Sequence, residues 1–306
     1  MSTMAKILLQ TTIVDRPDDW NVGRFSRLAE VLRRAGHDVT ARNRDEEKDD
    51  SRLSVLDTLD YDQLWLIAVD TGDGLSPDDA AAILRFREGG GGILTARDHQ
   101  DLGSCLLGLG SIGRLNHFHT QNPEIDARRD DQDNPGISWP NYHSGANGDY
   151  QPVFPTEPVH DLLKTGETES GHVEWFPAHP HEGAVSAPTD EPAARVVACG
   201  RSTVSGRRFN LAVCLDGETT PAGLPLGRAV AYSTFHHFAD MNWDTGAGAP
   251  SFVTDPPGDE IERDPSRLAI FQGHVHTVAR WLTGAEAQGR RRSRSTAGRS
   301  PARRRA

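Results

Sequence analysis

The sequence predicts an α/β fold in which a doubly wound, mostly parallel β-sheet is covered by helices and carries a long irregular insertion. Three observations lead to this prediction. Short apolar runs with β-branched residues alternate with segments of helical periodicity through the first hundred residues or so. Single helices of about ten to fifteen residues separate these runs, which is typical of right-handed parallel crossovers. Residues 116–191 are instead rich in Asn, Asp, Pro, Gly and His and show little periodicity.

The first strand is expected at Lys6–Val14, where an apolar run ends at the turn-forming segment DRPDDWN. A helix is expected over Val22–Ala35, because apolar residues recur there at helical spacing before Gly36. The segment HDVTAR then forms the second strand. After a short helix at Leu53–Leu59, the apolar run Tyr61–Val69 is typical of a buried third strand.

A second long helix is expected to begin at Ser76-Pro77. Ser is a preferred N-cap residue, Pro suits the first turn, and acids follow near the positive end of the helix dipole. This helix runs to about Glu88, and four glycines separate it from a fourth strand at Ile93–Ala96. After the insertion, three short strands and a closing amphipathic helix are expected at 195–199, 209–215, 228–234 and about 265–282.

Composition excludes several classes of protein. The chain has 306 residues, of which 36% are hydrophobic and 25% charged, and it contains no run of the roughly 20 apolar residues that a membrane-spanning helix needs. Its start lacks the small-residue cleavage site of a secretory signal, so we expect a cytoplasmic protein with no membrane partner. Three widely spaced cysteines are too few for a disulfide scaffold or a Cys-based zinc module.

The last 19 residues contain eight Arg and no acid, whereas the net charge of the whole chain is -11. A tail of Ser, Arg, Gly and Pro cannot bury enough apolar surface to fold. We therefore expect residues 285–306 to be a disordered Arg-rich tail and residues 1–284 to form one α/β domain with its insertion at about 116–191. The tail is either a solvated segment without a role or a weak, non-specific contact for nucleic acid.

Polar clusters follow several of the predicted strands, where ligands bind in an open parallel sheet. Asp98-His99-Gln100-Asp101 follows the fourth strand, at the turn where α/β hydrolytic folds hold a nucleophile. Here it offers acids and an imidazole in place of Ser or Cys. Asp98, His99 and Asp101 are therefore candidates for general acid and base catalysis or for ligating a metal that activates water. Alternatively, Asp98 or Asp101 simply caps the following helix.

A second cluster contains His236 and His237 and follows the last strand. If the chain stays extended, the two imidazoles point in opposite directions, so that one of them can face the site. Both are candidate catalytic residues, because imidazole titrates near pH 7 and is the commonest metal ligand. The alternative is a hydrogen-bonded structural histidine. Three further polar residues after strands are candidates for ligand binding: Asp70, Asp240 and Asn242.

A third cluster, His179-Pro180-His181-Glu182, lies in the irregular region. In an extended segment, residues at i and i+2 share one side, so both imidazoles would lie together beside Glu182. The candidate ligands for a divalent metal cofactor are therefore His179, His181, Glu182 and His236. The alternative is a surface loop with chance histidines.

The order of these elements resembles the class I glutamine amidotransferase-like superfamily. Within it, YDQLWLIAVDTGDGLSPDDAAAILRFREGGGGILTA is similar to the corresponding stretch of trehalose-utilisation (ThuA-like) proteins, and DHQDLG, HPHEG and STFHHFADMNW resemble segments of uncharacterised bacterial members. The resemblance implies a flavodoxin-like fold. True amidotransferases carry a Cys nucleophile at the turn after this strand, the elbow, and later a His-x-Glu pair. This chain has Ala96, Arg97, Asp98 and His99 at the elbow, so glutaminase chemistry through a thiolate is not expected. The resemblance places His236 or His237 near the second catalytic element.

Together these patterns predict a small-molecule hydrolase or isomerase, with metal assistance if the histidines hold an ion. The alternative is a non-catalytic ligand-binding or partner-binding module on the same fold, since fold does not fix function. Trp, Tyr and His residues of the insertion indicate a sugar-like or other polar cyclic ligand. The alternative is that these aromatic residues serve packing. The sequence does not indicate the substrate, the reaction or the oligomeric state.

Overall fold

The computed structural model describes residues 4–46, 48–124 and 142–284. Its centre is an eight-stranded sheet with the order β2-β1-β3-β4-β12-β11-β10-β7. The first five strands in this order, from β2 to β12, are parallel to their neighbours. Beyond β12 the strands β11, β10 and β7 pair antiparallel. The predicted α/β class with a mostly parallel sheet is therefore confirmed. The eight strands are β1 (Lys6–Thr11), β2 (Asp38–Arg42), β3 (Gln63–Ile67), β4 (Gly92–Ala96), β7 (Phe154–Pro155), β10 (Ala194–Arg201), β11 (Arg208–Leu215) and β12 (Ala229–Tyr232).

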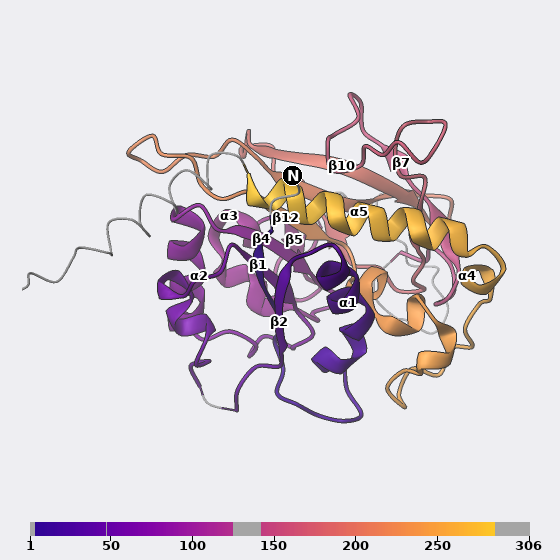
Figure 1. Ribbon diagram of the computed structural model, residues 1–306, viewed down its shortest axis with the longest axis horizontal. Helices are drawn as coiled ribbons and strands as arrows, with labels where there is room; N and C mark the ends of the chain where they lie inside the picture. The colour runs from indigo at the N-terminus through magenta and orange to yellow at the C-terminus, as the bar shows by residue number, and fades with distance from the viewer. Residues whose placement is uncertain (1–3, 47, 125–141, 285–306) are drawn as a thin grey trace, which may run out of the picture.

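Helices cover both faces of the sheet. Successive side chains of a strand point to opposite faces, so each buried strand contributes apolar side chains to two separate cores. Ile7 and Leu9 of β1 pack into the core formed with α1 (Ser26–Arg34) and α5 (Pro265–Thr283). Leu8 instead joins the core beneath α2 (Pro77–Glu88). Figure 1 shows α5 lying along the molecule near α1, with α2 set apart from both. The inner parallel strands β1, β3, β4 and β12 are consequently buried on both faces, whereas the edge strand β2 is partly exposed.

Of the three helices expected in the first half of the chain, one begins as predicted and two are wholly or partly 3₁₀ helices. Ser76 and Asp79 form a capping box at the start of α2, as the Ser-Pro-Asp-Asp pattern predicts. The helix expected from Val22 begins instead with the 3₁₀ turn η1 (Val22–Phe25), and α1 starts only at Ser26. The short helix expected at Leu53–Leu59 is the 3₁₀ helix η2 (Leu53–Thr58), kinked at Val55. The Asn21 side chain caps η1 at the predicted start, whereas α1 and η2 begin without a side-chain cap from their N-cap residues.

The irregular region contributes short elements that fold against the end of the main sheet. Two small antiparallel sheets pair β5 (Asn116–His117) with β9 (Ala184–Val185), and β6 (Tyr150–Pro152) with β8 (Trp175–Pro177). The remaining short elements are η3 (Ser104–Gly108), α3 (Gly110–Gly113), η5 (Phe235–Phe238), η6 (Asp240–Asn242), η7 (Thr245–Ala247) and α4 (Glu260–Arg263). None of the helices in the described ranges is long and apolar enough to cross a membrane. The Arg-rich tail predicted at 285–306 lies outside the described residues.

Candidate functional site

The site lies where β4 and β12 end. These two strands are parallel neighbours, with Ala96 opposite Tyr232, so the turns that follow them lie side by side. The Phe235 amide donates to the Arg97 carbonyl across 2.6 Å and joins the two turns. The segment that carries His179 closes over them, because the Gly183 amide donates to the Ser233 carbonyl at 3.1 Å. Three stretches that are far apart in sequence thus meet at one edge of the sheet.

Asp98 is the centre of this arrangement. One carboxylate oxygen, Oδ1, lies 3.2 Å from His99 Nδ1 and 3.6 Å from His179 Nδ1. The other, Oδ2, lies 3.5 Å from His236 Nε2. We call these four residues, Asp98, His99, His179 and His236, the Asp98 cluster. It brings together residues that the sequence assigned separately to catalysis and to metal binding.

Burial and charge set the protonation of the cluster. Burial alone would raise the pKa of Asp98, but the adjacent imidazoles of His99, His179 and His236 hold it well below its ordinary value. Burial lowers the pKa of His179 well below its ordinary value and also lowers that of His236. At neutral pH the cluster therefore contains the ionised Asp98 carboxylate beside the neutral rings of His179 and His236.

Several polar atoms of the cluster are left without hydrogen bonds. Asp98 Oδ1, His99 Nδ1 and His236 Nδ1 are buried and have no hydrogen-bond partner among the described residues. His179 Nδ1 has one, the hydroxyl of Thr234 at 3.3 Å. Buried polar groups are normally paired, and unpaired ones are enriched at sites that bind something. His99 is the most exposed member, with 19% of its side chain accessible.

His181 lies at the outer side of the cluster. Its ring centroid is 5.3 Å from that of His99 and 5.8 Å from that of His179. Its Nε2 is 3.3 Å from a carboxylate oxygen of Asp255, an acid that the sequence patterns did not single out. His179 and His181 therefore lie near each other as the spacing predicts, but only His179 contacts Asp98.

Glu182 turns away from the imidazoles into a separate buried cage. Its Oε1 accepts from Ser144 Oγ at 2.6 Å and from Gln151 Nε2, and its Oε2 accepts from Ser233 Oγ at 2.6 Å. His237 lies on the open side of this cage, with Nε2 3.7 Å from Glu182 Oε2. Burial raises the pKa of Glu182 to about 7, although the three hydrogen bonds oppose this rise.

His236 and His237 do separate as the sequence predicts, but for another reason. The chain is not extended there: it forms the 3₁₀ helix η5, capped by the Thr234 hydroxyl. His236 faces Asp98, whereas His237 Nδ1 donates to the Pro177 carbonyl at 2.9 Å. Burial lowers the pKa of His237 to about 3, so its ring is neutral and Nε2 carries a lone pair toward Glu182.

The other candidate residues serve other parts of the structure. Asp101 accepts from the amide and the hydroxyl of Thr120 at 3.0 and 2.7 Å. Asp240 accepts from the first amides of α1, at Ser26 and Arg27. The remaining two are buried: Asp70 accepts from Thr12 Oγ1 and Cys105 Sγ, and Asn242 Nδ2 donates to the Ala178 carbonyl.

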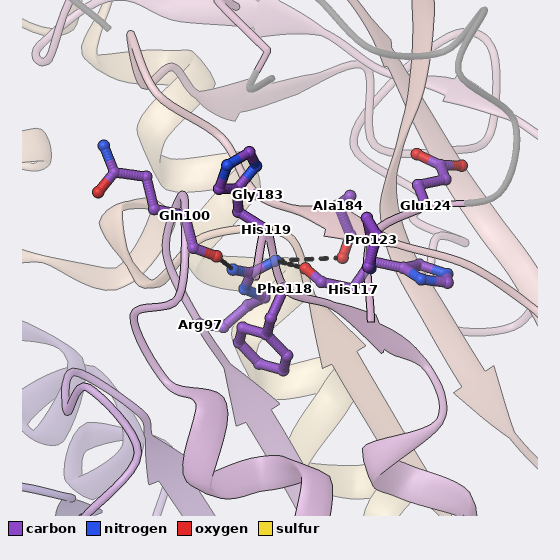
Figure 2. A pocket seen from close by; sticks show the side chains of 9 residues that line it. All are labelled: Arg97, Gln100, His117, Phe118, His119, Pro123, Glu124, Gly183 and Ala184. Carbon is purple, nitrogen blue, oxygen red and sulfur yellow. Dashed lines mark hydrogen bonds between the residues drawn. The ribbon is translucent and has the colours of Figure 1, made fainter. Parts of the chain in front are cut away.

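Arg97 is a site residue that the sequence patterns missed. Its guanidinium donates to the carbonyls of Gln100, His117 and Ala184 and lies 4.1 Å above the Phe118 ring. Figure 2 shows these groups around a pocket of about 40 Å³. Burial lowers the pKa of Arg97 to about 9, so it remains a cation at pH 7. The sequence feature that could have identified Arg97 is its position directly after a buried strand, because a charged side chain buried there needs polar partners.

Comparisons with known proteins give likenesses of fold. No protein-family model and no curated protein matches the chain. The structure is similar to a putative ThuA-like protein from Parabacteroides merdae, with 16% identity, a TM-score of 0.47, and coverage of 84% of this chain and 96% of that one.

Two further solved structures are similar. They are the glutaminase domain of CTP synthase from Trypanosoma brucei (14% identity, TM-score 0.44, 90% of this chain and 94% of that one) and a cytoplasmic protein from Salmonella typhimurium (13% identity, TM-score 0.38, 75% and 87%). A ThuA-like protein and a glutaminase domain, the two groups of the sequence resemblance, are both represented among these structures.

Proposed function

We propose that this chain is a small-molecule hydrolase or isomerase that works through the Asp98 cluster. The observation that supports this most directly is the contact of one buried carboxylate with three imidazoles. Both oxygens of Asp98 lie within 3.6 Å of ring nitrogens that come from the turns after β4 and β12 and from the segment between them. Both ring nitrogens of the buried His274, in contrast, have neutral hydrogen-bond partners, the Tyr232 hydroxyl and the Leu162 carbonyl.

His99 is the group of the cluster best placed to meet a substrate. It is the most exposed member, and its Nδ1 faces Asp98 Oδ1 at 3.2 Å. An ionised carboxylate at Nδ1 favours the tautomer with the proton there, which leaves Nε2 free to accept a proton from a ligand. In this proposal Asp98 is the orienting carboxylate and His99 is the general base.

The test is a turnover assay on a panel of small substrates. Hydrolysis is measured with p-nitrophenyl acetate, p-nitrophenyl phosphate and p-nitrophenyl glucosides, and isomerisation by proton exchange of aldoses in D₂O, followed by NMR. A positioned general base contributes about a hundredfold or more to the rate, so His99→Ala should lower turnover by at least that factor. The control is His172→Ala, because within the part of the chain that the structure describes the His172 ring is bonded only to the nearby Ser170 carbonyl. Equal rates for the wild type and His99→Ala, or no turnover of any substrate, would contradict the proposal.

A second candidate function is a non-catalytic ligand-binding module. It is favoured by the depth of the cluster, because the side chains of Asp98, His179 and His236 are each only 3% exposed. A panel of mono- and disaccharides and their phosphates, titrated calorimetrically, separates the two functions. If His99→Ala keeps the affinity and loses turnover, the enzyme is supported. If it loses affinity and the wild type turns nothing over, the module is supported.

For both candidate functions we propose a small, polar ligand, and specifically a sugar-like one. Its support is the aromatic packing of His236: Trp20 packs edge-on against this ring and Phe235 stacks on it, each with 4.6 Å between centroids. We also propose that the protein works in the cytoplasm.

A further inference from the structure

We propose that Asp98, His179 and His236 form a binding site for a divalent first-row transition-metal ion. This inference rests on the proposed function, because the ion would be the cofactor of the proposed hydrolase or isomerase. One ligand atom from each of the three residues lies within 4.8 Å of the other two. The closest approaches, 3.6 Å between Asp98 Oδ1 and His179 Nδ1 and 3.5 Å between Asp98 Oδ2 and His236 Nε2, are near the separation such a centre needs. Ligand atoms at about 2.1 Å from a tetrahedral ion lie about 3.4 Å apart.

The second observation is that a buried oxygen of the central carboxylate has no partner. Asp98 Oδ1 is buried and has no hydrogen-bond partner among the described residues. His179 Nδ1 is bonded to the Thr234 hydroxyl at 3.3 Å, and His236 Nε2 faces the other Asp98 oxygen. A buried carboxylate oxygen without a hydrogen bond is costly unless a cation is close to it. The nearby cation, Arg97, directs its two terminal nitrogens to backbone carbonyls rather than to Asp98. A bound divalent ion would supply the missing positive charge.

The donor set indicates the class of ion. Two imidazoles and one carboxylate bind Zn²⁺ in catalytic sites and Fe²⁺ in others, whereas Ca²⁺ and Mg²⁺ prefer oxygen ligands alone. Three protein ligands also leave a coordination position open, as in catalytic rather than structural centres. The more exposed rings, His99 and His181, lie next to this trio and are the groups that a ligand in the open position would meet.

The imidazole rings must move slightly to share an ion. As they stand, His179 and His236 are stacked, with 3.5 Å between centroids and 12° between planes. An ion equidistant from the two nitrogens would then lie out of both ring planes, whereas imidazole lone pairs lie in the plane. Rotation of one ring about its Cβ–Cγ bond brings its lone pair to the ion. Turning His236 breaks no hydrogen bond at Nδ1, whereas turning His179 would break its bond to the Thr234 hydroxyl, so we expect His236 to be the ring that turns.

Glu182 and His181, which the sequence offered as ligands beside His179 and His236, are not part of this set. Both oxygens of Glu182 already accept hydrogen bonds from Ser144, Gln151 and Ser233. His181 Nε2 is 3.3 Å from an oxygen of Asp255, on the outer side of the cluster. Substitution of either residue should therefore leave metal binding in place, which distinguishes this set from the one predicted by spacing.

The experiment is a metal measurement on tag-free, full-length protein. Chelated and dialysed protein is loaded separately with Zn²⁺, Mn²⁺, Co²⁺ and, anaerobically, Fe²⁺, and the bound metal is counted by inductively coupled plasma mass spectrometry. The wild type should retain about one ion per chain, and Asp98→Asn and His236→Gln should bind at least about tenfold more weakly. His181→Ala and Glu182→Gln are the matched controls and should bind as the wild type does. The Co²⁺ protein also gives a visible spectrum that reports imidazole coordination.

The outcomes separate the metal site from the proposed function. Binding of none of the four ions, or unchanged binding by Asp98→Asn with native circular dichroism, would overturn the metal site, even if the protein shows turnover. Loss of metal from Glu182→Gln but not from Asp98→Asn would favour the ligand set predicted by spacing. One ion per chain in a protein that turns over none of the substrates would leave the metal site standing and contradict the enzyme.

Discussion

The buried carboxyl group of Glu182 gives the sharpest prediction for stability. Glu182 is fully buried and holds three hydrogen bonds, and burial raises its pKa to about 7. The neutral ring of His237 faces its Oε2 at 3.7 Å. In the folded protein the carboxyl group therefore keeps its proton up to neutral pH, whereas in the unfolded chain it ionises near its ordinary value of 4.5.

The sign of the effect follows from proton binding. Between about pH 4.5 and 7 the folded state holds a proton that the unfolded state has released, so the free energy of unfolding falls as the pH rises. The contribution is fully present below pH 4.5 and lost above pH 7. At 1.36 kcal/mol for each pKa unit, the loss amounts to about 3 kcal/mol.

Glu182→Gln removes this titration and retains a group of the same shape. Near pH 4.5 the variant and the wild type should have similar stability, and by pH 8 the variant should be more stable by up to about 3 kcal/mol. The assay is urea denaturation at a series of pH values with a chelator present, extrapolated linearly to water. Glu169→Gln, at an exposed position, is the control and should parallel the wild type. A difference between Glu182→Gln and the wild type that stays constant, or that grows in favour of the wild type with rising pH, would refute a protonated Glu182.

Three further predictions concern the described scaffold and the tail. His274→Phe removes the bonds of His274 to the Tyr232 hydroxyl (2.8 Å) and the Leu162 carbonyl (2.9 Å), so urea denaturation should show a loss of about 1–3 kcal/mol. Asp240→Ala uncaps α1, and a loss of about 1–2 kcal/mol should appear in the same assay without a change in affinity for any ligand of the Asp98 cluster. Truncation after Gly284 should lower the salt concentration needed to elute the protein from a heparin column, and unchanged elution would exclude the nucleic-acid contact of the tail.

The fold was predictable where local signals agree with one another. Ser76, Pro77 and the acids after them define the start of α2 because each satisfies a different need of a helix N-terminus. The strands were predictable because their apolar runs are buried on both faces. The meeting of Asp98 with His236 was also predictable, since the ends of parallel strands share one edge of a sheet, and β4 and β12 are direct neighbours.

The remaining part of the site was not predictable from spacing, because it depends on the path of an irregular segment. His179, His181 and Glu182 lie within four residues, yet their side chains enter three different environments. Regular alternation fails there because the Tyr142–Glu182 bridge and the hydrogen bonds from Ser144 and Ser233 fix Glu182 inward. These partners lie 38 or more residues away in the chain, so no local pattern reveals them.

Arg97 shows how the scaffold determines the chemistry of its neighbour Asp98. Gln100 has a positive φ of 53°, the only non-glycine residue in the described chain to do so, and the Arg97 guanidinium holds its carbonyl. The same guanidinium holds the carbonyls of His117 in β5 and Ala184 in β9. A left-handed conformation in a residue with a side chain costs about 1 kcal/mol or more and persists only where surrounding contacts fix it. Arg97 therefore joins the elbow to the segment that follows His179. The distances within the Asp98 cluster consequently depend on Arg97, although this side chain donates no hydrogen bond to the imidazoles of the cluster.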